Sequence, residues 1–233
     1  MTIYVFGDSY SVEYDDNGLY PPGKLYCDWK GYVPKKYFHH LKEHLNAEKI
    51  INYSISGNDN ENIFEKFTEI YKEIKDDDLI IFNWSTIDRF SIDANLDYTV
   101  GDDKSHWFSS SSFNKIGWID KMKINRGGSL YYNRIFNLIH FINEVLKPNK
   151  VIHWTWSYNH TLEDKRTIQF ETNKEVNDFH YNEETHYKLY ENMILKLKES
   201  DKIFINLWKR PVFNKKINQI SKLFDNENQT PIS

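Results

Sequence analysis

Short apolar runs alternate with segments of helical periodicity along most of this 233-residue chain, and this alternation is the strongest constraint on its fold. The runs at 3–6, 49–52, 79–82, 151–155 and 203–205 are mostly apolar or β-branched, as buried parallel strands are. Apolar residues recur every three or four positions at 34–45, 60–74, 129–146 and 183–197, which predicts amphipathic helices. The pattern predicts a three-layer α/β/α sandwich around a mostly parallel five-stranded sheet.

The chain length favours one domain, and no linker or internal repeat divides the sequence. Residues 91–128 interrupt the alternation, because they are rich in Asp, Ser and Gly with aromatic residues interspersed. Loops of this length in compact domains are usually functional or disordered, and the aromatic content favours a functional insertion after the third strand. We expect one further short helix near residues 212–224.

Composition excludes several classes of protein. The chain has 30 Lys and Arg against 34 Asp and Glu, a net charge of −4, so it lacks the basic field that attracts nucleic acid. A single cysteine, Cys27, cannot form an internal disulfide. No apolar run approaches the roughly 20 residues that span a bilayer. We therefore expect neither a nucleic-acid nor a membrane partner.

The amino terminus does not resemble an export signal. It lacks a basic start, an apolar stretch of about 7–15 residues and a small-residue cleavage site. This predicts a cytoplasmic protein. Asn, Lys and Ile are abundant while alanine occurs only at Ala47 and Ala94, a bias typical of AT-rich genomes such as those of many viruses or low-GC bacteria. A viral origin would make the protein virion-associated.

Polar residues follow the predicted strands at the edge where α/β sheets bind ligands, beyond the carboxyl ends of the strands. The first strand ends in Gly7-Asp8-Ser9, and the second runs into a loop containing Gly57. A glycine before a helix allows a substrate to approach backbone N–H donors closely. The remaining polar positions are Asn58, Asn83, Ser85 and Arg89, and, just before the last helix, Asp178 and His180.

Taken together, these segments resemble the SGNH or GDSL hydrolase family. The resemblance rests on Gly7-Asp8-Ser9, on Asn52-x-Ser54-x-Ser56-Gly57, and on Asp178-x-His180 with His186 further on. It implies the flavodoxin-like fold of that family and a serine esterase that needs no cofactor. Ser9 is then the nucleophile, His180 the general base and Asp178 the residue that orients it, a combination that suits acyl transfer.

The resemblance also implies an oxyanion hole, with the backbone N–H groups of Ser9 and Gly57 as two of its donors. The third block departs from the family pattern Gly-x-Asn-Asp, because this chain has Asn83-Trp84-Ser85-Thr86. Ser85 aligns with the family's asparagine and is the expected third donor, with Asn83 and Asn58 as alternatives. A second departure is the single residue between Asp178 and His180, where two are commoner.

Seven Trp and 16 Tyr make the chain rich in aromatic rings, which suit sugars but serve a core equally well. We expect an esterase that removes a small acyl group, such as acetyl, from a small molecule or glycan. The alternative is a non-catalytic glycan-binding or structural protein with a degenerate fold, and a lipase would need a long apolar groove that the sequence does not identify. The expected substrate-binding residues are Asp8, Trp84, Arg89, Trp154 and Trp156.

The remaining histidines are predicted to be structural. His186 falls on the apolar face of its helix, which favours a packed histidine. No cluster of His, Cys and carboxylate side chains has the spacing of a known metal site, so no metal is expected. The helix at 34–45 carries a set of residues typical of a solvated face, namely Lys35, Lys36, His39, His40, Lys42, Glu43 and His44.

Overall fold

A five-stranded, all-parallel sheet forms the centre of the computed structural model, which describes residues 1–15, 21–85, 90–91, 107–108, 129–155 and 181–205. The strand order is β2-β1-β3-β6-β7, one of the two common doubly wound orders. All five predicted strands are present: β1 (Thr2–Phe6), β2 (Lys49–Asn52), β3 (Leu79–Trp84), β6 (Lys150–Thr155) and β7 (Lys202–Ile205). The predicted α/β class is therefore confirmed.

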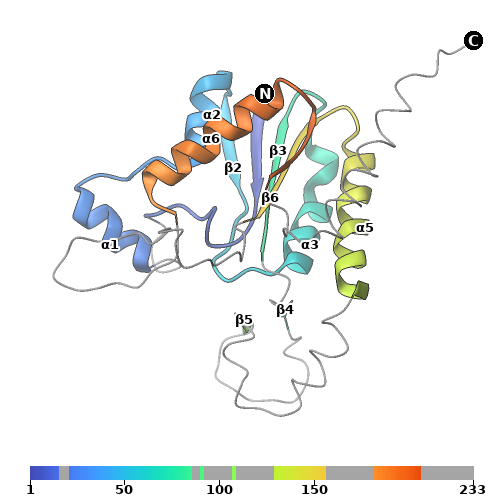
Figure 1. The fold of residues 1–233 in the computed structure, drawn as a ribbon, viewed down its shortest axis with the longest axis horizontal. Helices are drawn as coiled ribbons and strands as arrows, with labels where there is room; N and C mark the ends of the chain where they lie inside the picture. Colours follow the sequence, from blue (N-terminus) through green and yellow to red (C-terminus); the bar gives the residue numbers. More distant parts are fainter. Residues whose placement is uncertain (16–20, 86–89, 92–106, 109–128, 156–180, 206–233) are drawn as a thin grey trace, which may run out of the picture.

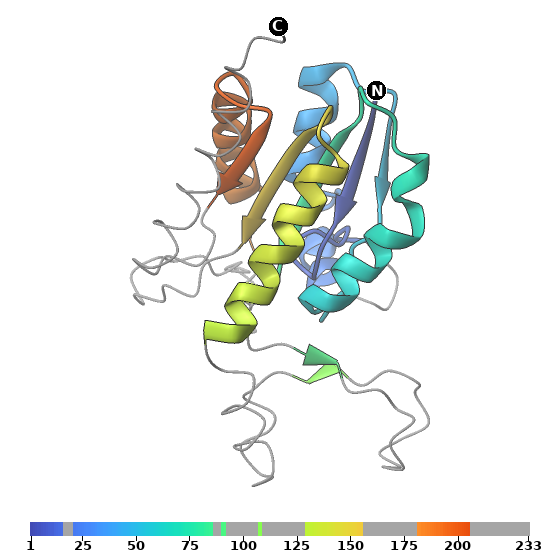
Figure 2. The ribbon, with the colours of Figure 1, turned by 90° about the vertical axis from the view of Figure 1, so that its right-hand side faces the viewer.

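Helices cover both faces of the sheet (Figure 1). They are α2 (Tyr37–Leu45), α3 (Asn60–Ile70) followed by the 3₁₀ turn η1 (Tyr71–Glu73), α5 (Ser129–Val145) and α6 (Glu183–Leu197), whereas α1 (Pro21–Lys30) lies to one side of the sheet. Helices α2 and α6 lie side by side on one face, and α3 and α5 lie on the other, as the view turned by 90° also shows (Figure 2). This arrangement is consistent with the predicted three-layer sandwich.

Alternation along the strands divides the core into two halves. In β1, Ile3 and Val5 face α2 and α6, whereas Tyr4 and Phe6 face α3 and α5. Strand β3 is buried along its whole length because both of its faces are covered. The continuous apolar runs of the sequence follow from this double coverage.

Three helices differ from the prediction. Helix α1 was not predicted, because Pro21, Pro22 and Gly23 are residues typical of a turn, although proline also suits the first turn of a helix. Tyr26 anchors α1 by packing against Tyr14, with ring centroids 5.2 Å apart. Helix α2 begins at 37 rather than 34, since its N-cap has extended backbone angles. Helix α3 ends at residue 70, four residues early.

Two short strands lie at the predicted insertion. Strand β4 (Phe90–Ser91) pairs antiparallel with β5 (Trp107–Phe108). The rest of the segment 91–128 and the helix expected near 212–224 lie outside the described residues, so their predicted roles stay predictions. Among the helices that the structure describes, none is both long and apolar enough to cross a membrane.

A buried histidine links β6 to the helix layer on one side. His153 Nδ1 accepts a hydrogen bond from Trp84 Nε1 at 3.1 Å, and His153 Nε2 lies 2.9 Å from Asn143 Oδ1 on α5. Since Nδ1 accepts, the ring proton sits on Nε2 and is donated to Asn143. Burial lowers the pKa of His153 to about 3, so the ring is neutral at physiological pH.

The free energy of unfolding is expected to fall as the pH drops below 6.5. The unfolded chain protonates His153 near its ordinary pKa of 6.5, whereas the folded protein does so only near 3, so acidification favours unfolding. Between pH 7 and pH 5 the loss is about 2 kcal/mol. Urea unfolding at both pH values measures it, with His153→Gln as the control that cannot titrate. If the free energy of unfolding changed equally with pH in the wild type and in His153→Gln, the result would contradict a buried, neutral His153.

Candidate functional site

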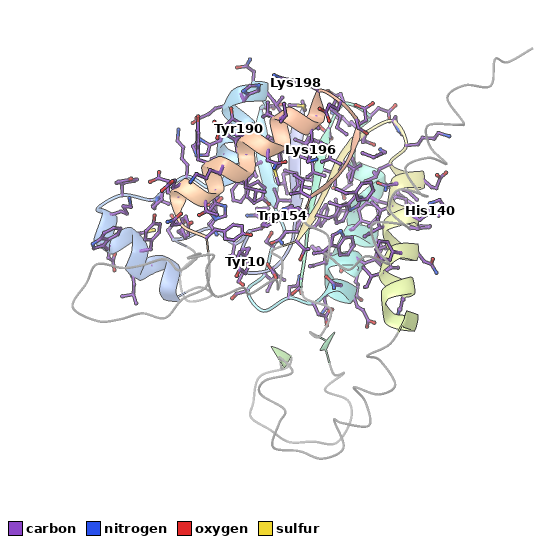
Figure 3. All side chains as sticks on the ribbon, viewed as in Figure 1. Tyr10, His140, Trp154, Tyr190, Lys196 and Lys198 are labelled. Atoms are coloured by element: carbon purple, nitrogen blue, oxygen red, sulfur yellow. The ribbon has the colours of Figure 1, made fainter. Side chains whose placement is uncertain are left out.

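The sheet topology brings the segments after β1, β2 and β3 to one edge. From β1 to β2 the chain crosses on the face of α2, and from β2 to β3 it passes over β1 on the face of α3. The direction of winding therefore reverses between β1 and β3, which is where ligands bind in doubly wound sheets. The predicted segments at Ser9, Gly57 and Asn83 all lie at this edge, and Figure 3 shows Tyr10 there, below Trp154.

A glycine is required at position 7 because the end of β3 closely approaches the turn that follows β1, which we call the β1 turn. A Cβ atom at Gly7 would lie 2.7 Å from Asn83 Cβ, closer than real Cβ atoms approach, and 3.1 Å from Asn83 Oδ1, which is a tight contact. The Gly7 carbonyl also accepts hydrogen bonds from Ile55 N at 3.1 Å and from Asn58 Nδ2 at 3.2 Å. Gly7 thus joins the segments that follow all three strands.

The β2 loop presents Gly57 in a tight turn. Asn58 N donates to the Ile55 carbonyl at 3.2 Å, and Gly57 has φ +80°, a left-handed value that favours glycine. Asp59 then caps α3 by accepting a hydrogen bond from Asn62 N at 2.9 Å. The turn and the helix cap together fix the loop beside the β1 turn.

The turn that carries Ser9 is held by its own aspartate. Asp8 Oδ1 accepts from Tyr10 N at 3.1 Å, and the Asp8 carbonyl accepts from Ser11 N at 2.9 Å. Asp8 is fully buried and Ser9 is only 3 % exposed. Asp8 therefore has a clear structural role in the described residues, and its predicted contact with substrate stays a prediction.

Asn83 presents a buried amide to this turn. Its Oδ1 accepts from Ser11 Oγ at 2.9 Å, and Ser11 Oγ lies 2.8 Å from Tyr37 OH. Because the Ser11 proton is used on Asn83, Tyr37 donates to Ser11, and burial raises the pKa of Tyr37 so that it keeps its proton. Asn83 Nδ2 is buried and has no hydrogen-bond partner among the described residues. An amide N–H₂ group in this state is suited to bind an oxygen of a ligand.

The two other candidates for a third oxyanion donor lie in segments that structural hydrogen bonds hold in place. Asn58 Nδ2 donates to the Gly7 carbonyl. The peptide groups around Ser85, which is fully buried, bind the Asn60 side chain: Ser85 N donates to Asn60 Oδ1 at 2.7 Å, and Asn60 Nδ2 donates to the Ser85 carbonyl at 3.3 Å. Within the described residues, Asn83 is the candidate whose side-chain nitrogen makes no hydrogen bond, whereas Asn58 Nδ2 uses one of its two hydrogens on Gly7.

Two of the predicted substrate-binding tryptophans are fully buried. Trp84 stacks on Phe82 and His153 in the core beneath α3 and α5, and Trp154 packs in the core beneath α2 and α6. What the structure describes of both is therefore a packing role, and a contact of either with substrate stays a prediction. The remaining predicted residues, Arg89, Trp156, Asp178 and His180, lie outside the described residues.

The described chain resumes at Tyr181, which packs against the β1 turn. The rings of Tyr181 and Tyr10 meet edge to face with centroids 5.0 Å apart, and Tyr14 OH donates to the Tyr181 carbonyl at 2.5 Å. Trp154 stacks on Tyr181 from the sheet side, at 6.1 Å. The start of α6 is therefore fastened to the loop after β1, 167 residues earlier in the chain.

His186 lies in the interior, as expected of a packed histidine. It is fully buried on α6, where its ring stacks on Tyr37 at 5.8 Å and meets the edges of Tyr14 and Tyr181. Among the residues that the structure describes, no three His, Cys, Asp or Glu side chains are placed to hold a metal ion.

The prediction for Lys36 was wrong. Instead of lying on a solvated face, Lys36 is fully buried, and its Nζ donates to the Tyr10 carbonyl at 3.2 Å and lies 4.2 Å from the centre of the Tyr14 ring. Helical periodicity does not predict the position of the Lys36 side chain, because Lys36 is the N-cap residue and its backbone is extended rather than helical. Neither Lys36 nor Ser11 carries a sequence signal for these contacts, apart from the position of Ser11 just after β1.

Comparison of the chain with models of known protein families and with curated proteins gives no match. The functional proposal therefore rests on the sequence motifs, the fold and the contacts of the described residues.

Gly7→Ala is expected to lower the free energy of unfolding by about 1–3 kcal/mol, because the added methyl group overlaps Asn83. Urea unfolding measures the change. Gly31→Ala is the matched control: Gly31 has φ +74° but nothing within 4 Å of an added Cβ, so its cost comes from backbone conformation alone, about 1–2 kcal/mol. An unchanged stability for Gly7→Ala would show that the β1 turn and β3 separate easily.

Proposed function

We propose that this protein is a serine ester hydrolase of the SGNH type, with Ser9 as nucleophile, His180 as general base and Asp178 as the residue that orients the base. It removes a small acyl group, such as acetyl, from a small molecule or a glycan. The observation that carries the proposal is the contact between Tyr10 and Tyr181, the residues that directly follow the nucleophile and the base in the chain.

This contact supports a site shared by Ser9 and His180, because each of these residues is covalently bonded to one of the two contacting tyrosines. One peptide bond joins Ser9 to Tyr10, and one joins His180 to Tyr181. The Tyr10 and Tyr181 rings touch, and Tyr14 OH binds the carbonyl of Tyr181. The contact lies at the edge of the sheet where a doubly wound fold binds its ligand.

The donors around the β1 turn support acyl transfer. The N–H groups of Ser9 and Gly57 are two proposed oxyanion donors, and the loops that carry them are joined through the Gly7 carbonyl. We assign the third donor to Asn83 rather than Ser85, since Asn83 Nδ2 is buried without a partner in the described part of the chain and Ser11 holds its oxygen. Fixed donors of this kind stabilise the negative charge of the tetrahedral intermediate.

The proposed reaction has two halves. Ser9 Oγ attacks the carbonyl carbon of the ester as His180 takes the hydroxyl proton, and His180 then protonates the alcohol that leaves when the C–O bond breaks. Water attacks the acyl-Ser9 ester, its proton passes to His180, and the bond to Ser9 Oγ breaks as Ser9 regains the proton. The products are an alcohol and a carboxylic acid, and no cofactor takes part.

One observation favours the alternative of a non-catalytic glycan-binding protein. Ser9 is 3 % exposed, and a nucleophile must reach its substrate. A fluorophosphonate probe decides between the two, because it reacts with an activated serine only. Stoichiometric labelling at Ser9 supports the esterase, and a folded, inert protein supports the binding protein.

Ser9→Ala is expected to lower kcat for 4-nitrophenyl acetate by about 10⁴-fold or more, because the acyl-enzyme cannot form. Ser54→Ala is the matched control, since it removes a nearby hydroxyl whose oxygen has no hydrogen-bond partner among the described residues. Initial rates of the purified variants, with circular dichroism to verify folding, provide the measurement. Full activity of Ser9→Ala would remove Ser9 from the mechanism.

Asn83→Asp is expected to reduce kcat by about 10²–10³-fold with little change in KM, because it removes the proposed oxyanion donor. Aspartate keeps the size of the side chain and an oxygen that accepts from Ser11. Ser85→Ala is the comparison variant, and we expect it to change kcat less. A larger loss in Ser85→Ala would assign the third donor to Ser85 instead.

A further inference from the structure

A fully buried lysine lies behind the β1 turn. Lysine is almost never fully buried unless it is paired, because removing an ammonium group from water is costly. Here Lys36 Nζ donates to the Tyr10 carbonyl at 3.2 Å and lies 4.2 Å from the centroid of the Tyr14 ring. The carbonyl and the electron-rich ring face both attract the cation.

Tyr14 connects Lys36 to Tyr181, the residue at which the described chain resumes before α6. Its side chain is fully buried, and its hydroxyl donates to the Tyr181 carbonyl at 2.5 Å. The contacts therefore run without a break from the carbonyl of Tyr10, through Lys36 Nζ and the Tyr14 ring, to the carbonyl of Tyr181. We name Lys36 and Tyr14 the bracket.

The two ends of the bracket lie in connecting segments. Tyr10 belongs to the turn after β1, and Tyr181 precedes α6. Neither residue is held by the ladder of the sheet, so side-chain contacts must set the separation between the two segments. A serine and its base must stay within hydrogen-bond reach, and a displacement of about 1 Å can cost 10²-fold in rate.

We propose that Lys36 and Tyr14 are positioning residues, which hold the turn carrying Ser9 at a fixed distance from Tyr181, the residue that follows the proposed base His180 in the chain. The inference rests on the proposed function, since it concerns the geometry of the same site. Both residues act through backbone carbonyls next to the reacting groups, and neither contacts the substrate.

Tyr14→Phe tests the bracket most cleanly, because it removes one hydroxyl and keeps the ring beneath Lys36. We expect it to slow fluorophosphonate labelling of Ser9 and to lower kcat for 4-nitrophenyl acetate by about 10–100-fold, with KM unchanged. Lys36→Met keeps a chain of similar length without the charge and should have the same effect. If Lys36→Met does not fold, Tyr14→Phe alone still decides the outcome.

Tyr26→Phe is the matched control. The Tyr26 hydroxyl accepts a hydrogen bond from Glu183 N at 3.2 Å, so it ties α1 to the start of α6, and Tyr26 is almost as buried as Tyr14. The control therefore removes a comparable structural contact outside the bracket. We expect its labelling rate to stay within about threefold of the wild type, a change of roughly 0.6 kcal/mol.

The double variant Tyr14→Phe with Lys36→Met adds a second readout. Because both residues act through one continuous set of contacts, the double variant should be no slower than the slower single variant, whereas independent effects would multiply. Multiplied effects, or a Tyr14→Phe rate equal to that of the wild type, would overturn the bracket while leaving the esterase intact. A folded wild type that is not labelled at Ser9 would overturn the proposed function, and the inference with it.

Discussion

The position of β1 between β2 and β3 is the constraint on which the rest of the structure depends. β1 is hydrogen-bonded to a parallel strand on each side, so its carboxyl end is flanked by the carboxyl ends of β2 and β3. The chain crosses to β2 on one face and returns to β3 on the other, which leaves the space above this end free of a crossover helix. Gly7 lets the turn after β1 approach β3 closely enough for Asn83 to reach Ser11.

The site is built from buried polar groups that support one another. Asp8, Ser11, Asn83 and Tyr37 lose their contact with water, and hydrogen bonds within the group offset most of that cost. An apolar cluster of the same size would contribute more to stability with fewer geometric demands. The network leaves the Asn83 amide hydrogens without a partner in the described residues, and the proposed esterase uses them to bind the oxyanion.

The contacts between the loop after β1 and the start of α6 form the second part of the candidate site. Tyr10, Tyr14 and Lys36 all contribute to a joint with Tyr181, and aromatic rings make up most of it. Three of the 16 tyrosines, whose rings would also suit a sugar, therefore connect two distant parts of the chain. In the proposed esterase, this joint sets the geometry of the nucleophile and its base.

Local patterns in the sequence determined the strands, the class of fold and most of the helices. The strand at 49–52 and the helix at 183–197 form at the predicted bounds, since short apolar runs and helical periodicity depend on neighbours in the sequence. Only the tertiary structure decided that α1 forms against Tyr14, that Lys36 is buried, and that the Asn83 side-chain nitrogen is buried without a hydrogen-bond partner among the described residues. These depend on contacts between residues far apart in the chain, such as Tyr14 with Tyr181, and no local periodicity encodes them.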